Sequence, residues 1–285
     1  MMTQDRPVWL ITGCSTGFGR ELARQVLARG WRAVVTARDL STLDDLIRDH
    51  DDRALALELD VTNHEQVVAV ANQAVMRFGR IDALVNNAGY GYLAAIEEGE
   101  DEAVRAMFEA NVFGLVDMTK AVLPTLREQR NGIIINISSI GGLASFGATG
   151  YYHGTKYAVE GISESLAIEV KPLGIDVLIV EPGPFRTNWA GPSIKSSATV
   201  IDDYDGTAGE RRRQTAQRSG NQAGDPVRAA TAIIDAASSP TPPLRLLLGK
   251  QALELARKKL ETMRRDFDTW EATTLGADFP PDQSS

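Results

Sequence analysis

The sequence predicts an α/β protein built on a doubly wound parallel sheet of about seven strands, with helices on both faces. Short apolar runs alternate with helical patterns from the N-terminus to about residue 250. These runs are apolar throughout, as in parallel strands that are buried on both faces. A glycine-rich segment directly follows the first run, as in Rossmann-type folds that bind dinucleotides.

The first strand, turn and helix are the most informative unit. Val8 to Thr12 is apolar, a glycine-rich turn follows, and a helical pattern then runs to Gly30, a typical C-terminal stop. Glycines let a backbone turn tightly and approach a pyrophosphate at the helix N-terminus. The spacing differs from GxGxxG, so an ordinary glycine-rich turn is the alternative, but the strand and helix around it favour phosphate binding. The residues predicted to contact the cofactor here are Gly13, Ser15, Thr16, Gly17, Phe18 and Gly19.

The second strand, residues 32 to 36, ends close to Arg38 and Asp39. In dinucleotide-binding folds an acid at this position holds the 2′-hydroxyl of NAD, whereas an arginine accepts the 2′-phosphate of NADP. Asp39 has a simpler use as the cap of the next helix. The sequence therefore favours NADP(H) over NAD(H), with Arg38 as the residue that distinguishes them.

The remaining elements repeat the alternation. The predicted strands cover residues 54 to 59, 83 to 85, 133 to 137, 175 to 180 and 245 to 248; the predicted helices cover 62 to about 78, about 102 to 130, and a stretch through Tyr152 to about Val170. Thr62 to Glu65 has the pattern of a capping box. Polar residues follow several strands, at the sheet edge where open α/β folds bind ligands.

Tyr152 and Lys156 form a possible general acid/base pair. Four residues apart on a helix, they share one face. A free tyrosine has a pKa of about 10, and a lysine at ~4 Å in an effective dielectric of ~20 contributes about 4 kcal/mol, enough to lower that pKa to near 7. Tyr151 has Thr155 four residues on and cannot form such a pair. We expect His153 to be a surface or pocket-wall residue.

Several motifs occur together in one order. They are Thr12-Gly13-x-x-x-Gly17-x-Gly19, Asn86-Asn87-Ala88-Gly89, Asn111, Ser139, Tyr152-x-x-x-Lys156 and Pro182-Gly183. Over residues 7 to 250 the chain resembles the short-chain dehydrogenase/reductase family in its compact, single-domain branch.

The resemblance implies a role for each matching position. Tyr152 would exchange a proton with a carbonyl or alcohol, Lys156 would lower its pKa and bind the nicotinamide ribose, and Ser139 would polarise the substrate oxygen. Asn111 would hold a water that leads from Lys156 to solvent. The further cofactor contacts that the resemblance implies are Asp60, Val61, Asn87, Ala88, Gly89, Pro182, Gly183 and Thr187.

These residues also have ordinary structural explanations. Ser139 and Asn87 could form turns at strand ends, Asp60 could stabilise a helix N-terminus, and Asn111 could be a tolerated polar residue in a helix. No lysine or arginine precedes Gly17, so Arg38 would hold the 2′-phosphate largely alone.

Composition supports a cytoplasmic enzyme without nucleic-acid or membrane partners. The 285 residues carry a net charge of −8, which disfavours nucleic acid, and no apolar run reaches membrane-spanning length. The single cysteine, Cys14, excludes internal disulfides, and we expect it to be buried. The uninterrupted alternation predicts one cofactor-binding and catalytic domain over residues 1 to 250, followed by a C-terminal segment, 251 to 285. We expect a homodimer or homotetramer.

The substrate region lies near the C-terminus. Residues 190 to 224 are polar and fall where the family has its substrate lid, and their composition favours mobility. The candidate pocket walls are Phe185, Trp189, Tyr90, Tyr92 and Phe146, which suit an apolar ketone or secondary alcohol. An amphipathic helix from Gln251 to about Trp270 is expected to pack on the body or on a second subunit, and residues 272 to 285 to form a loose tail.

The function predicted is NADP(H)-dependent hydride transfer between nicotinamide and a ketone, aldehyde or secondary alcohol. A non-catalytic NADP(H)-binding regulator on the same fold is the alternative, although Ser139, Tyr152, Lys156 and Asn111 would be superfluous in it. A nucleotide-sugar epimerase or lyase would use a similar tyrosine and lysine. The segment after residue 190 leaves little room for the larger substrate domain of such enzymes.

Overall fold

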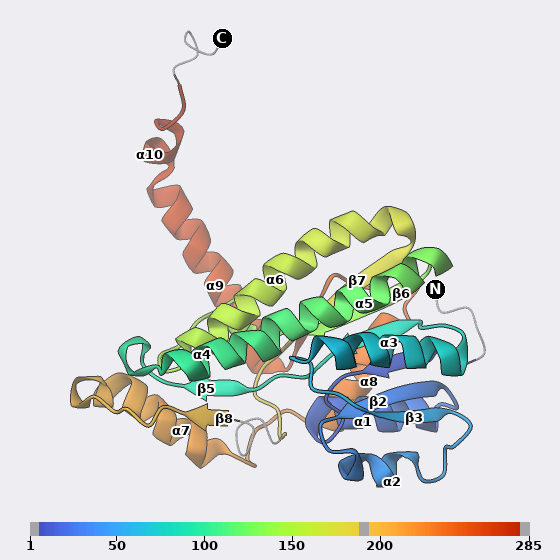
Figure 1. Cartoon of the computed structure of the whole chain (residues 1–285). Helices are drawn as coiled ribbons and strands as arrows, with labels where there is room; N and C mark the ends of the chain where they lie inside the picture. Colours follow the sequence, from blue (N-terminus) through green and yellow to red (C-terminus); the bar gives the residue numbers. More distant parts are fainter. Residues whose placement is uncertain (1–5, 188–193, 280–285) are drawn as a thin grey trace.

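A seven-stranded parallel sheet forms the centre of the protein, in the order β3-β2-β1-β4-β6-β7-β9 (Figure 1). The computed structural model describes residues 6–187 and 194–279. The strands are β1 (Val8–Ile11), β2 (Arg32–Ala37), β3 (Ala54–Glu58), β4 (Ala83–Asn86), β6 (Gly132–Ile137), β7 (Ile175–Pro182) and β9 (Arg245–Leu248), with a separate parallel pair, β5 (Gly91–Leu93) and β8 (Ile194–Ser196). The predicted fold class is confirmed.

Helices cover both faces of the sheet. They are α1 (Gly17–Ala28), α2 (Asp44–Ile47), α3 (His64–Phe78), α4 (Asp101–Phe108), α5 (Gly114–Gln129), α6 (Gly150–Val170), α7 (Glu210–Arg218), α8 (Pro226–Ala237), α9 (Lys250–Thr269) and α10 (Glu271–Leu275). Buried residues of α1 and α8 pack on one face, and those of α3, α5 and α6 on the other. Strand order reverses direction beside β1, where such folds bind ligands.

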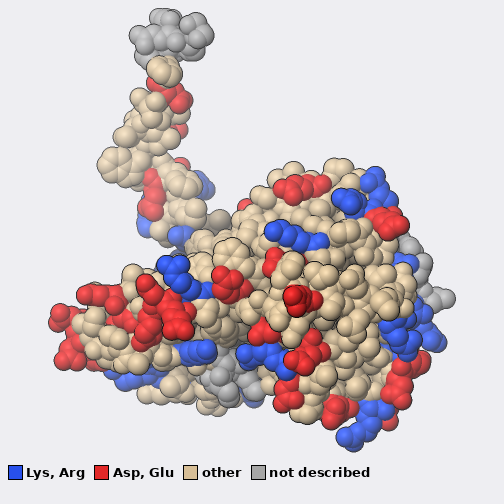
Figure 2. All heavy atoms as spheres, viewed as in Figure 1, with Lys and Arg blue, Asp and Glu red and all other residues tan. Residues whose placement is uncertain are grey.

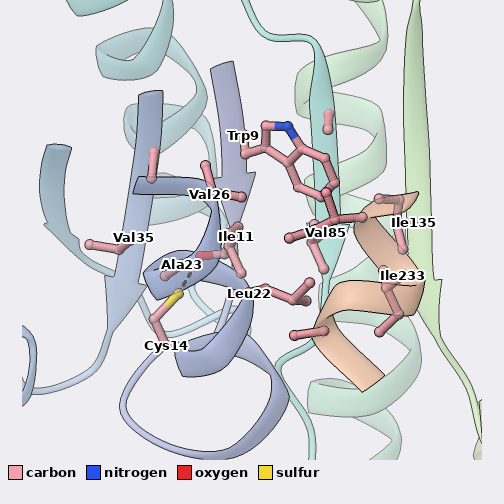
Figure 3. Packing of buried hydrophobic residues seen from close by; sticks show 14 of the residues in the cluster. Trp9, Ile11, Cys14, Leu22, Ala23, Val26, Val35, Val85, Ile135 and Ile233 are labelled. Atoms are coloured by element: carbon pink, nitrogen blue, oxygen red, sulfur yellow. Dashed lines mark hydrogen bonds between the residues drawn. The ribbon is translucent and has the colours of Figure 1, made fainter. Parts of the chain in front are cut away.

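The alternation of side chains along β1 explains the two cores. Trp9 and Ile11 point to the α1/α8 face, whereas Val8 and Leu10 point to the α3/α5/α6 face. Figure 3 shows the first core, in which Trp9 lies among aliphatic side chains from β4, β6 and α8. All four β1 residues are fully buried, so the strand is apolar throughout.

Two predicted helices have different boundaries from those expected. The cap of α3 is Asn63, whose side chain accepts a hydrogen bond from the Gln66 backbone, so the capping box at Thr62 is wrong by one residue. Thr62 instead donates to Asp60. The predicted helix over 102–130 is interrupted by a π-helical turn, η3 (Glu109–Phe113), between α4 and α5.

The C-terminal segment also differs from its prediction. The helix predicted from Gln251 is α9, but residues 272–275, expected to be loose, belong to α10. The predicted lid contains β8 and α7 within its described residues, and α8, which follows it, was not predicted. The first lid residues, 190–193, lie outside the described residues.

Candidate active site

The sequence-predicted site residues gather at the carboxyl edge of the sheet. They lie between β1 and α1 (Gly13, Ser15, Thr16, Gly17, Phe18, Gly19), after β2 (Arg38), after β3 (Asp60, Val61), after β4 (Asn87, Ala88, Gly89), after β6 (Ser139), at the end of β7 (Pro182, Gly183) and beyond it (Thr187), with Asn111, Tyr152 and Lys156 on η3 and α6. The parallel sheet produces this grouping, because all its strands end at one edge.

The glycine-rich turn is held by the segment after β4. The Asn87 side chain donates to the carbonyls of Thr12 and Gly13 at 2.8 and 2.9 Å, and the Thr12 hydroxyl accepts from the backbones of Asn87 and Ala88. A Cβ on Gly19 would lie 2.4 Å from the Gly13 carbonyl oxygen. Only glycine therefore fits at position 19, and the turn is a rigid backbone cradle.

Thr187 reaches back to this turn from beyond β7. Its Cβ lies 3.6 Å from the position that a Cβ would occupy on Gly17. Gly183 is fixed by a backbone hydrogen bond to Leu248 of β9, 2.9 Å long. The segment after β7 therefore closes over the mouth of the turn, while Phe185 packs edge-on against Phe18 at 5.2 Å between ring centroids.

Arg38 and Asp39 have different surroundings. The Asp39 carboxylate caps a short helix by accepting from the backbone and hydroxyl of Ser41, at 3.0 and 2.7 Å. Arg38 is exposed and has no acidic partner within 4.0 Å among the described residues. It lines an open hollow of about 720 Å³ together with Glu58, Asp60, Thr62, Asn63, His64, Glu65 and Gln66.

Ser139 and Tyr152 form a hydrogen bond at the end of β6. The Ser139 hydroxyl also accepts from the Gly141 backbone at 3.0 Å, which makes Ser139 the cap of a short helix, η4 (Ile140–Gly142). Burial raises the pKa of Tyr152 to about 12, and the hydrogen bond to Ser139 only partly opposes this. In the protein alone the phenol is therefore a protonated, buried donor.

Lys156 lies one helical turn beyond Tyr152. Its ammonium donates to the Ile137 carbonyl at 2.7 Å and lies 5.7 Å from the centroid of the Tyr152 ring. Burial lowers the pKa of Lys156 to about 8, against the opposing charge of Glu160. The expected lowering of the tyrosine pKa toward 7 is not seen in the protein alone, because the effect of burial on Tyr152 is larger.

Asn111 joins three segments through its side chain. The amide donates to the Tyr90 carbonyl at 2.9 Å and to Thr155 at 3.2 Å, and its oxygen accepts from the Tyr90 backbone at 3.0 Å. A Cβ on Gly89 would lie 2.9 Å from that oxygen. The π-helical turn thus brings Asn111 against α6, one residue from Lys156. These hydrogen bonds distinguish Asn111 from a polar residue that a helix merely tolerates.

His153 corrects the prediction of a surface or pocket-wall residue. It is 4% exposed, accepts at Nε2 from the Phe146 backbone at 3.0 Å, and lies 3.0 Å through Nδ1 from the Gly141 carbonyl. These contacts assign the proton to Nδ1. Burial lowers the pKa of His153 to about 4, so the ring is neutral at pH 7. His153 holds the loop between Ser139 and Tyr152.

A buried ionic cluster behind the site was not predicted. Arg245 of β9 pairs with Glu160 of α6, Glu181 of β7 and Glu164, the last at 2.6 Å. The Ser138 hydroxyl donates to Glu160 at 2.5 Å. Burial raises the pKa of Glu181 to about 7. The only sequence signal was the acidic residue in Glu181-Pro182-Gly183, which ends an otherwise apolar strand.

The predicted pocket walls fall into different environments. Tyr92 is 2% exposed, and its hydroxyl donates to Glu100. It is a residue of the interior, and the prediction that it forms a pocket wall is wrong. Phe146 packs against His153, and the Arg211 guanidinium lies 5.2 Å from its centroid. The Tyr90 ring lies 4.9 Å from the Lys195 ammonium. Trp189 lies outside the described residues.

Among the described residues of the predicted lid, one ion pair connects the segment to the body and another lies within the segment. Arg212 of α7 pairs with Glu98 at 2.5 Å, and Arg213 pairs with Asp205 at 2.6 Å. The Glu98 side chain is fully buried, and Arg212 lowers its pKa to about 2. The Glu98 carboxylate also accepts from the backbones of Ala95 and Ile201. Glu98 therefore connects α7 to the segment after β5.

Within the described residues there is neither a metal-binding group nor a membrane-spanning helix. Across residues 6–187 and 194–279, no group of three or more His, Cys, Asp or Glu side chains could hold a metal ion. Among the helices in those ranges, none has the length and apolarity needed to cross a membrane. Cys14 is buried as expected, with its thiol 3.3 Å from the Ile11 carbonyl, and burial raises its pKa to about 12.

Comparison with known proteins identifies the family. Residues 7–197 match the family model described as short chain dehydrogenase. The chain is 36% identical over 271 residues to Oxidoreductase BOA17 of Botryotinia fuckeliana, covering 95% of this chain and 98% of the relative. A solved short-chain dehydrogenase from Streptomyces avermitilis is 43% identical, with a TM-score of 0.91, and covers 96% of this chain and all of that one.

A more distant solved structure contains a cofactor analogue. It is an alcohol dehydrogenase from Thermococcus sibiricus complexed with 5-hydroxy-NADP, 25% identical, with a TM-score of 0.70 over 85% of this chain and 96% of that one. The family model covers more than half of the chain, and Oxidoreductase BOA17 aligns over nearly the full length of both chains. The chain therefore belongs to the short-chain dehydrogenase/reductase family of nicotinamide-dependent oxidoreductases.

Proposed function

We propose that the protein is an NADP(H)-dependent oxidoreductase that interconverts a ketone or aldehyde with the corresponding alcohol. The grouping of Ser139, Tyr152 and Lys156 at the carboxyl edge of the sheet carries the proposal. Beside them lies the glycine-rich cradle, whose backbone suits a pyrophosphate. A cofactor along this edge would place its nicotinamide near Tyr152 and its adenosine near Arg38.

The bound cofactor would supply a hydride to the carbonyl carbon, or accept one from the alcohol carbon. In the reductive direction Tyr152 donates its proton to the carbonyl oxygen, so the carbonyl gains one hydride and one proton. Ser139 donates a hydrogen bond to the same oxygen as negative charge develops on it. Lys156 stabilises the resulting phenolate and holds the nicotinamide ribose, and Asn111 holds the water that leads from Lys156 to solvent.

Arg38 supports NADP(H) as the preferred cofactor. Its guanidinium is exposed, with no acidic partner among the described residues, whereas Asp39 already serves as a helix cap. An arginine in this position accepts a 2′-phosphate. The Thermococcus relative, which was solved with an NADP analogue, is in keeping with this assignment. The remaining cofactor contacts are those predicted above, including Asp60, Val61, Thr187 and Asn87 to Gly89.

The substrate is proposed to be a small, fairly apolar carbonyl compound or secondary alcohol. Tyr90 packs on the cluster that contains Tyr152, Phe146 packs against His153, and Arg211 of α7 lies over the Phe146 ring. We further propose that residues 1–250 form one cofactor-binding and catalytic domain and that the protein assembles as a homodimer or homotetramer.

The test is oxidation of NADPH and of NADH with a broad panel of ketones and aldehydes. We expect turnover with NADPH, and its loss by more than a thousandfold in Tyr152→Phe, because removing the proton donor removes general acid catalysis and its charge stabilisation. Binding of NADPH should stay within a fewfold of wild type.

Tyr151→Phe is the matched control. The Tyr151 hydroxyl donates to the Ile96 carbonyl, away from Ser139, so this variant should retain turnover. Activity of Tyr152→Phe within tenfold of wild type would contradict the proposed mechanism. Tight NADPH binding without turnover on any substrate would favour the non-catalytic regulator.

A further inference from the structure

The C-terminal helix α9 leaves the body of the protein and continues into solvent (Figure 1). Near its start, Ala252 and Ala256 are buried against Ile140 of η4. From Leu260 onward no residue of the helix is buried, apart from partial cover of Thr262. Figure 2 shows this segment, residues 260–279, as an arm that projects from the globular part.

The exposed arm carries a regular apolar seam. The seam residues recur at alternating intervals of three and four: Leu253, Ala256, Leu260, Met263, Phe267 and Trp270. This is the a/d pattern of a coiled coil. The seam is covered by the body only at its beginning: Leu260 is 67% exposed, and Phe267 and Trp270 are each 63% exposed.

A single helix in water does not bury the apolar side chains of this seam. α9 spans 20 residues, about 30 Å, and an isolated helix of such length is marginal without tertiary packing. Contiguous exposed aromatic and aliphatic side chains mark interaction surfaces. A second helix that packs along the arm would bury the exposed side chains at the end of this seam.

We propose that residues 260–269 of α9, together with its C-cap Trp270, pair antiparallel with the same segment of a second copy of this chain. In this register Leu260 lies beside Trp270 of the second copy, and Met263 lies beside Phe267 of the second copy. A two-fold axis repeats each contact, so every large seam residue of the arm is covered by one from the other arm. The interface needs no other protein.

The charges along the arm favour the antiparallel direction. Residues 257–259 are all basic, and Glu271 lies at the far end of the arm. Antiparallel pairing sets Arg257 beside Glu271 of the second copy, twice, whereas parallel pairing would align the basic runs with each other. Arg264 meets its own copy near the axis, but each Arg264 already pairs with Asp268 of its own helix at 3.6 Å.

The position of the body supports the same direction. The body covers the helix only near its start, through Ala252 and Ala256. An antiparallel pair places the two bodies at opposite ends of the paired segment. This proposal is independent of the proposed oxidoreductase function, because it is tested without turnover.

Directed disulfide formation tests the pairing. Cys14 is fully buried, so a cysteine introduced on the arm is the accessible thiol. Leu260→Cys and Trp270→Cys proteins are purified separately, mixed to allow exchange and oxidised mildly. We expect the 260–270 heterodisulfide to exceed both homodisulfides by at least fivefold. Predominant homodisulfides would overturn the antiparallel register, and no disulfide would overturn the interface.

Measurement of molar mass by light scattering is the second test. Leu260→Glu combined with Phe267→Glu should halve the mass of the assembly. Thr262→Glu combined with Thr269→Glu adds the same charge on another face of the helix and should leave the mass unchanged. An unchanged mass in the seam variant, or seam-dependent binding of a wild-type monomer to anionic phosphatidylserine vesicles, would overturn the proposal.

Discussion

At the residue scale, Tyr152 is a protonated phenol whose acidity is reduced by burial. Burial keeps its pKa at about 12, so the phenol is protonated across the physiological pH range. The pair with Lys156 and the thirteen-residue gap to Ser139 were readable from the sequence, because helix periodicity and motif spacing are local. The burial that sets the pKa is not local, and it could not be predicted.

Arg38→Asp should reverse the proposed cofactor preference. Losing a charged contact to the 2′-phosphate costs about 1.5–3 kcal/mol, so the NADPH/NADH ratio of kcat/KM should fall about 10- to 150-fold. Steady-state kinetics with both cofactors measure the ratio. Asp39→Asn is the control, since it keeps a side-chain oxygen for the Ser41 cap and should leave the ratio nearly unchanged. A constant ratio in Arg38→Asp would place the 2′-phosphate elsewhere.

His153 should make the protein sensitive to acid. Its pKa is about 4 in the folded protein and about 6.5 in the unfolded chain, so the unfolded chain binds more protons between these values. Its contribution, up to about 3 kcal/mol, is complete above pH 6.5 and is lost as the pH falls to 4. Chemical denaturation from pH 7.5 to 4 should show a shallower slope in His153→Gln than in wild type. His64→Gln, which changes an exposed histidine, should keep the wild-type slope.

At the level of elements, strands were predicted better than helix ends. The apolar runs that form β1, β4 and β6 are buried on both faces, which leaves a clear pattern in the sequence. The π-helical turn η3 leaves none, because residues 109–113 have ordinary helical composition and the turn is selected by the contacts of Asn111. Helix α8 was missed beside a polar segment, although Pro226 at its first position is a typical start signal.

The attachment of α7 should depend on Glu98. Glu98→Gln removes the buried carboxylate that pairs with Arg212. Breaking such a pair costs about 3–5 kcal/mol. The cost is lower here because water can solvate the partly exposed guanidinium of Arg212. Limited proteolysis should then cut within residues 194–224 at least tenfold faster. Asp205→Asn removes an exposed ion pair to Arg213 and should leave the rate of proteolysis close to that of the wild type. Equal effects of the two variants would show that Glu98 does not hold the lid.

At the scale of the whole molecule, the sequence predicted the sheet class and the edge at which the site lies. It did not predict the buried cluster of Glu160, Glu181 and Arg245, because those residues come from three elements and look like ordinary surface charges in the sequence. The sequence also did not predict the exposure of α9. An amphipathic pattern shows which face of a helix is apolar, but it does not show which surface covers that face.

Arg245→Met should destabilise the entire fold. It removes the arginine that pairs with the buried Glu160 and Glu181, and we expect a loss of about 3–5 kcal/mol in the free energy of unfolding at pH 7. Denaturant titration measures the loss. Arg24→Met removes an exposed pair with Glu21 and should change the free energy by less than about 1 kcal/mol. A similarly small effect for Arg245→Met would show that the buried carboxylates take up protons at no cost.

The position of Arg245 in the chain also determines when its ion pair with Glu160 can form during biosynthesis. Arg245 follows Glu160 by 85 residues, and ribosomes add roughly 5–20 residues per second, so Glu160 waits about 4–17 s for its counter-ion. Every residue of the proposed proton-transfer group is made before that interval begins. A nascent chain stalled before residue 245 would therefore hold the chemical groups of the site on an unfinished sheet, and chaperones would meet it as a client rather than as an enzyme.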